Sequence, residues 1–259
     1  MRARCRDAVP EVMATGSVRV RDVRASRGAA WLREGFGFFR ARPLAWIGLS
    51  LGWMVITFGL IIVPFVGGVV ANLLQPVFFA SFALAAVKQR AGQSIDSSDL
   101  FSGFRRGIKP LVIIGAILLA AEIAIFALMA LAGLPSMGSS GEEITTMQEW
   151  LQALEGKEWI LVVGLVLTAI VKGALWFAPA LLAFHDMSAI HAIRWSIYAA
   201  LSNAMAMVVY GLALTVAVAA AVLPWGAGLI IVVPMMLAST YAGYRDVFED
   251  VVPAEATPQ

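Results

Sequence analysis

Two ionisable residues, Glu122 and Lys172, lie near the middle of long apolar stretches of this chain. A charge at the centre of a bilayer costs about 2.5–3.5 kcal/mol on insertion scales. Such residues therefore pair with each other, face a protein interior or line a path through the membrane. A carboxylate and an ammonium together could form a structural ion pair, or could handle protons or a substrate, so these two residues are the candidate site.

Three interpretations of these residues remain open. The first, which we favour, is an ion pair that fixes the register of two helices. The second is a site that handles protons or a substrate. In the third, Glu122 is unpaired and protonated because of desolvation, while Lys172 reaches a wet cavity.

Other chemistry finds little support in the sequence. His185, Asp186 and His191 could in principle hold a metal, but the six-residue histidine spacing places the rings on different helix faces. Serine, histidine and aspartate occur without a nucleophile elbow, and no glycine-rich phosphate loop is present. The single cysteine, Cys5, excludes an internal disulfide and a thiolate cluster. We therefore expect no catalytic residues, no metal, no cofactor and no enzymatic activity.

The composition indicates which elements must position the pair. The 259 residues are 60% hydrophobic and only 14% charged, and the mean hydropathy is +0.83. Soluble domains carry about 25% charged residues. Apolar runs of about 20 residues, the length that crosses a bilayer core of roughly 30 Å, recur along the chain. The sequence therefore predicts an all-α, polytopic membrane protein.

We predict six membrane-spanning helices, the first two separated by Gly67-Gly68. The predicted spans cover residues 44–66, 69–87, 110–134, 159–184, 204–223 and 227–244. Four prolines inside or at the end of these spans predict kinks or helix ends: Pro64, Pro76, Pro179 and Pro234.

The distribution of lysine and arginine predicts the orientation. Seventeen of these residues fall on the side of the termini, and one, Lys157, falls on the other, with Lys172 left out as intramembrane. Because basic loops stay in the cytoplasm, both termini should be cytoplasmic, in a bacterial inner membrane. No secretory signal is visible. We predict that residues 1–27 form a flexible basic arm, which either sets the topology or contacts anionic lipid. No nucleic-acid-binding fold lies beside it. Residues 249–259 are predicted to be a cytoplasmic tail.

An amphipathic segment precedes each odd-numbered span, at residues 31–40, 97–108 and 188–201, with Ser97 and Ser188 as candidate caps. These segments are either interfacial helices or cytoplasmic extensions packed on their neighbours. Two pairs of segments in the chain also have similar sequences. Residues 40–49 match residues 107–116, and residues 76–88 match residues 234–246, which predicts three copies of surface helix, span, span.

The predicted hairpin of spans three and four carries an outer insertion and the candidate pair. Residues 135–158 predict an acidic amphipathic helix that stops before Gly156. Glu122 lies twelve residues after Pro110, and Lys172 lies twelve before Phe184. Both are then about 18 Å from the cytoplasmic ends of their spans. We therefore expect them to meet in adjacent antiparallel helices.

Three stretches carry a resemblance to a known family: "WLREGFGFFRARPLAWIGL" (31–49), "LLQPVFFASFALAAVKQRAGQSIDSSDLFSGFRR" (73–106) and "WFAPALLAFHDMSAIHAIRWSIYAALSNAMAMVVYGL" (176–212). Together they resemble uncharacterised bacterial inner-membrane proteins with six spans, more distantly similar to YciC-like proteins. The resemblance covers most of residues 31–248. It implies a location and a topology but no catalytic residues, and it does not extend to the basic arm or to the Glu122 and Lys172 pair.

Two functions of different class follow from these features. One is a structural or interaction protein of the membrane, whose partners would be lipids and either other proteins or further copies of itself. The alternative is a small-molecule or lipid transporter that uses a polar site between spans three and four.

Overall fold

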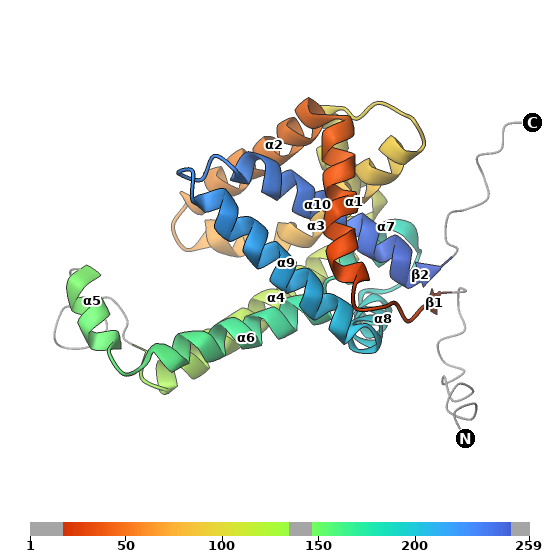
Figure 1. Cartoon of the computed structure of the whole chain (residues 1–259). Coiled ribbons are helices and arrows are strands. Elements are labelled where there is room, and N and C mark those ends of the chain that lie inside the picture. The colour runs from red at the N-terminus through yellow and green to blue at the C-terminus, as the bar shows by residue number, and fades with distance from the viewer. Residues whose placement is uncertain (1–17, 135–146, 250–259) are drawn as a thin grey trace, which may run out of the picture.

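The structure is a computed structural model that describes residues 18–134 and 147–249, almost all of them helical (Figure 1). The all-α fold class is therefore confirmed. In chain order the elements are β1 (Arg19–Val20), α1 (Arg27–Ala41), α2 (Pro43–Ile61), α3 (Val66–Arg90), the 3₁₀ helix η2 (Ser97–Phe101), α4 (Ser102–Leu131), α5 (Met147–Leu154), α6 (Glu158–Ala174), α7 (Ala178–Phe184), α8 (Ala189–Ser202), α9 (Ala204–Val222), α10 (Leu229–Val247) and β2 (Phe248–Glu249).

Five helical stretches are long and apolar enough to cross a membrane, and they correspond to the first five predicted spans. They are Pro43–Ile61, Val66–Arg90, Ser97–Leu131, Glu158–Phe184 and Ala204–Val222. The predicted sixth span is present as the 19-residue helix α10 but is not one of these candidates. Polar residues fill its second half, including Ser239, Thr240, Arg245 and Asp246, and they lower its hydropathy. Six spans are therefore not confirmed.

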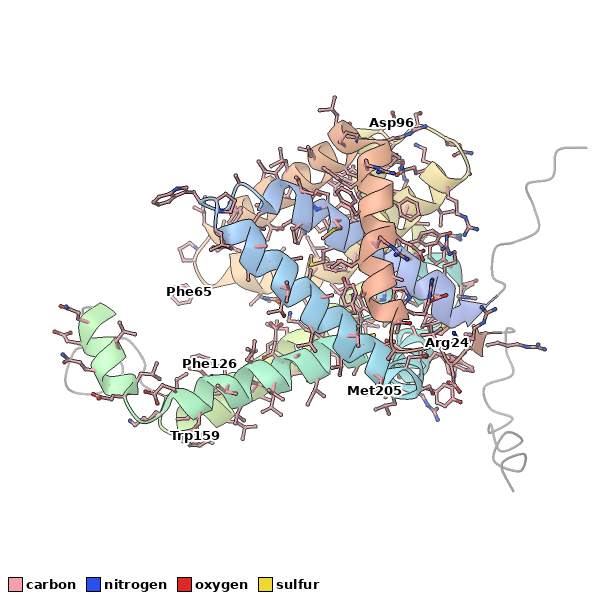
Figure 2. All side chains as sticks on the ribbon, viewed as in Figure 1. Arg24, Phe65, Asp96, Phe126, Trp159 and Met205 are labelled. Carbon is pink, nitrogen blue, oxygen red and sulfur yellow. The ribbon has the colours of Figure 1, made fainter. Side chains whose placement is uncertain are left out.

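The packed core lies at one end of the molecule, where α1 and α7 meet the second halves of α3 and α10. The largest fully buried side chains belong to this end: Trp31, Trp46, Phe78, Phe82, Phe177 and Phe248. At the other end apolar side chains are exposed, as Phe65 and Trp159 are in Figure 2, opposite Arg24 and Asp96. Lipid solvates such side chains as well as protein does, so these helices need no protein cover.

Helix α1 crosses α9 and α10 through two close glycine contacts. A Cβ on Gly28 would lie 2.0 Å from the Ala206 carbonyl oxygen, and one on Gly35 would lie 2.3 Å from that of Met235. Only glycine lets the backbones approach so closely. Of the two interpretations of this amphipathic segment, packing on neighbouring helices is the one that its contacts favour.

The second amphipathic segment begins with a capping box, but its cap is not the predicted Ser97. The side chain of Asp96 accepts a hydrogen bond from the backbone of Asp99, and the Asp99 carboxylate accepts one from the Asp96 N–H at 2.7 Å. The reciprocal pair satisfies two donors at the start of η2. The prediction missed it because a serine and an aspartate are equally good caps by sequence.

The start of α4 packs on α3 and is separated from its span by a kink. A Cβ on Gly103 would lie 2.3 Å from the Val77 carbonyl oxygen, and the Gly103 N–H donates to Ser81 Oγ at 2.9 Å. Gly107 has a φ of +132°, a conformation that favours glycine, and it breaks the helical geometry just before Pro110. Residues 97–106 therefore pack on α3 at an angle to the span that follows.

The third amphipathic segment, α8, has the predicted cap and an outward apolar face. Ser188 Oγ accepts a hydrogen bond from the N–H of His191. Small residues such as Ser196 face the core, whereas the predicted apolar residues Ile190 and Leu201 are 65% and 73% exposed. This face is directed away from the protein, as in a helix that lies against lipid.

The first turn and the prolines differ in detail from the prediction. The chain turns at residues 62–65, and Gly67 already lies in α3, where a Cβ would clash with the Leu60 carbonyl. The join is therefore earlier than the predicted Gly67-Gly68. Pro64 lies in that turn, and Pro179 lies in the first turn of α7. The other two predicted prolines lie inside α3 and α10.

Residues 18–26 are attached to the fold, so the prediction of a flexible arm is wrong for this segment. β1 pairs antiparallel with β2. The Asn203 side chain accepts a hydrogen bond from the Val23 N–H at 2.7 Å and donates one to the Arg21 carbonyl at 3.1 Å. Glu249 belongs to this ladder and not to the tail. The rest of the predicted arm and tail lies outside the described residues.

Helices α4 and α6 form a hairpin that extends from the bundle to α5 (Figure 1). The helix predicted in the insertion is present as α5, and Gly156, with a φ of +77°, follows its end. The remainder of the predicted insertion, residues 135–146, lies outside the described part of the chain. We call residues 118–131 and 158–174 "the α4–α6 hairpin".

Candidate functional site

The structure brings the two predicted site residues together. Lys172 Nζ on α6 lies 2.6 Å from Glu122 Oε1 on α4. Their side chains are 44% and 28% exposed, so the protein covers neither completely. The predicted contact is present, and it joins the two helices of the α4–α6 hairpin.

The surroundings of Lys172 differ from the prediction, because a turn interrupts the fourth predicted span. α6 ends at Ala174, only two residues after Lys172, and the chain turns before α7 begins. Ser196 of α8 bridges the break: its hydroxyl donates to the Ala174 carbonyl at 2.7 Å and accepts from the Phe177 N–H at 3.1 Å. Lys172 therefore lies close to the end of α6 and not in the middle of a continuous span.

This position lowers the cost of the charge. The 17 residues of α6 rise about 25 Å, slightly less than the roughly 30 Å bilayer core. A lysine near the end of such a helix can extend its ammonium toward the polar layer while its stem stays in hydrocarbon. Glu122, in contrast, keeps its predicted place inside α4, twelve residues after Pro110.

Lys172 also lines a pocket of about 120 Å³ between α3, α4 and the break after α6. Gln75 and Lys172 are its polar lining residues. The remaining lining is apolar: Pro76, Phe79, Leu118, Leu175, Trp176 and Pro179. Glu122 is paired with Lys172 but does not line the pocket.

The break beside this pocket is fixed by aromatic contacts. The Trp176 ring lies 4.6 Å from that of Tyr210 and 5.9 Å from that of Trp31, between ring centroids. The Tyr210 hydroxyl lies 2.8 Å from Ser239 Oγ. Helices α1, α9 and α10 therefore hold the turn after α6, and the pocket wall formed by Trp176 is rigidly placed.

A second charged cluster, not predicted from the sequence, joins α1 to the end of α10. Arg27 contacts Asp246 at 2.6 Å and Glu34 at 2.9 Å, while Arg245 contacts Glu34 at 2.6 Å. The Trp31 indole N–H donates to Asp246 at 2.8 Å. The hydrogen bond to Asp246 raises the pKa of Arg27. Opposite charges alternate in this cluster, so it neutralises itself and holds the helices together.

The two histidines of this cluster have separate hydrogen-bond partners. His185 Nε2 lies 2.9 Å from the Tyr244 hydroxyl, and burial lowers the pKa of His185. His191 Nδ1 lies 3.1 Å from Ser188 Oγ. Within residues 18–134 and 147–249, no three His, Cys, Asp or Glu side chains gather as they would around a metal ion.

The apolar helices and the basic, tightly packed end define the class: a multi-pass integral membrane protein. The chain is 28% identical, over 256 residues, to a Burkholderia thailandensis protein named "Probable inner membrane protein". The alignment covers 88% of this chain and 93% of the relative. Together these observations place the chain in the inner membrane.

The comparisons support the predicted resemblance only in its coarse form. No protein-family profile matches the chain, and no solved structure matches it. The relative's name supports a group of inner-membrane proteins and says nothing of transport. The more distant likeness to YciC-like proteins stays a prediction.

Proposed function

We propose that the protein has a structural or interaction role in the inner membrane, and that the α4–α6 hairpin is the surface that contacts another membrane protein. One observation carries this proposal. The ion pair of Lys172 and Glu122 joins two helices that otherwise extend away from the bundle (Figure 1).

The exposed residues of the hairpin support this role. Ile123 and Phe126 on α4 are each 60% exposed, and Leu165 and Ile170 on α6 are 71% and 60% exposed. Between the two helices, packing is close, since a Cβ on Gly164 would overlap the Met129 side chain. The hairpin is therefore held together internally and presents apolar surface to its surroundings. Transmembrane helices associate through such surfaces by shape and dispersion.

The orientation that we propose places both termini in the cytoplasm. The described lysines and arginines other than Lys157 and Lys172 lie at the packed end of the bundle. The positive-inside rule then puts the packed end in the cytoplasm. We also propose α10 as a sixth span, because its 19 residues rise about 28 Å and its charged residues lie in the last turn.

The three-repeat organisation is supported by equivalent contacts. Gly35 of α1 contacts α10 at Met235 and at Ser239, four residues later. Gly103 of α4 contacts α3 in the same way, at Val77 and Ser81. In α3 and in α10, the residue just before the first contact is the proline shared by the two matching segments, Pro76 or Pro234. α8 packs on α7 of its own preceding hairpin. Each surface helix would then rest on the second helix of the hairpin before it, with α1 on the last.

Site-specific photo-cross-linking in living cells tests the interaction role. A photoreactive amino acid at Leu165 or Ile170 on α6 should give a discrete protein adduct, identified by mass spectrometry. The matched positions Val55 on α2 and Val216 on α9, both 70% exposed, should give lipid adducts only. Lipid adducts at all four positions would contradict the proposal.

A further inference from the structure

We propose that the pocket beside Lys172 binds part of one acyl chain of a phospholipid, whose phosphate contacts the Lys172 ammonium. This inference is independent of any protein partner at the hairpin. It concerns a lipid that stays bound and does not require transport.

The ammonium has unused capacity for an anion. A lysine ammonium carries three hydrogens, all donors. Of these, one suffices for the 2.6 Å contact with Glu122, while 44% of the Lys172 side chain remains exposed. A phosphate is a strong acceptor that a lysine binds as a point charge. Lys172 can therefore hold Glu122 and a phosphate oxygen together.

The pocket has the size and lining for hydrocarbon. Its volume is about 120 Å³, with walls that include Phe79, Leu118 and Trp176. Apolar cavities of about 150 Å³ are large enough for a benzene-sized molecule. The pocket thus holds only a segment of a chain, while the rest lies along the protein surface in the bilayer.

The occupant is a lipid because of where the pocket lies. Its walls belong to three membrane helices, so lipid is the molecule at highest concentration around it. Lys172 is two residues from the end of α6, which Ser196 of α8 joins directly. α8 turns its apolar face outward, as a helix at the headgroup layer does. From this break, the stem of Lys172 can extend the ammonium toward the phosphates.

Lipid retention by the purified full-length protein tests the proposal. The protein is delipidated in dodecyl maltoside, which has no phosphate, and then incubated with phosphatidylglycerol or with diacylglycerol of the same chains. Native mass spectrometry counts the lipids that remain bound. We expect one phosphatidylglycerol per protein and weak retention of diacylglycerol. Lys172→Met should lower phosphatidylglycerol retention about fivefold, the effect of losing one lysine contact. Leu118→Trp, which fills the pocket, should lower it with Lys172 still in place.

Two controls separate this site from a general loss of structure. Lys109→Met removes an exposed lysine at the same end of the molecule and should leave retention unchanged. Glu122→Gln breaks the ion pair but frees a donor of Lys172, so retention should be equal or higher. Equal retention in the wild type and in Lys172→Met would overturn the proposal. So would equal losses in Lys172→Met and Glu122→Gln, since they would show that only the ion pair matters, and so would equal retention of the two lipids.

Discussion

At the scale of single residues, the pair of Lys172 and Glu122 is important because each charge would be expensive alone. The ammonium and the carboxylate lie 2.6 Å apart in a part of the molecule that is otherwise apolar. A charge left without its partner in such surroundings pays a desolvation cost that nothing offsets. Replacing both partners with uncharged residues removes the attraction and the cost together.

A double-mutant cycle measures this coupling. We expect Glu122→Gln and Lys172→Met each to lower the free energy of unfolding in detergent by about 1.5–3 kcal/mol, the range for a hydrogen bond to a charged group. The double variant should recover much of that loss. Strictly additive losses would show that the two side chains are not coupled.

A second prediction at this scale concerns His185, whose pKa burial lowers from its usual 6.5. The unfolded chain then binds a proton at higher pH than the folded protein does. Stability from this group is complete above about pH 6.5 and is lost as the pH falls below that value. The unfolding temperature should therefore decrease from pH 7.5 to pH 5.5, and less so in His185→Gln. An identical pH dependence in the two proteins would refute this role.

At the scale of elements, glycines determine how the surface helices pack. Gly28 and Gly35 are one heptad apart, so they lie on the same face of α1, and each meets a backbone carbonyl. Contacts of this kind replace side-chain interdigitation with direct backbone approach. The ion pairs of Arg27 and Arg245 then lock α1 onto the end of α10.

Two glycines of α1 provide a matched test of this packing. Gly35→Ala places a methyl group 2.3 Å from the Met235 carbonyl oxygen. We expect it to cost about 1–3 kcal/mol, as overpacking does. Gly37 has open space around its Cβ position. Gly37→Ala should be neutral or stabilise the helix by up to about 1 kcal/mol. Similar unfolding temperatures for the two variants would contradict the packing of α1 on α10.

The sequence predicted elements better than it predicted their ends and contacts. Long apolar runs locate membrane helices because the hydrophobic length is set by the bilayer. Pro179 predicted a kink or a helix end in this span, but the position of the break after Ala174 was not predictable, since Leu175, Trp176 and Phe177 continue the apolar run. Ser196, which satisfies the broken helix, is twenty-two residues away from Ala174. The contact of Lys172 with Glu122 could be predicted from their charges and from their equal distances to the span ends, but the position of the turn beside Lys172 could not.

At the scale of the whole molecule, packing and charge are both asymmetric. The end that carries the arginines is tightly packed, whereas only 17% of the apolar windows of α2 and α9 is buried. A soluble protein with such exposed helices would aggregate. In a bilayer the same helices are solvated by lipid. The excess of arginines at the packed end predicts that this end faces the cytoplasm.

Cysteine labelling of spheroplasts with a membrane-impermeant maleimide tests this orientation most directly, in a Cys5→Ser background. Phe65 and Trp225 are 97% and 102% exposed at the splayed end, and Ser98 is exposed at the packed end. Phe65→Cys and Trp225→Cys should label in intact spheroplasts, whereas Ser98→Cys should label only after lysis. Labelling of Ser98→Cys in intact spheroplasts, with protection at the other two positions, would contradict the account.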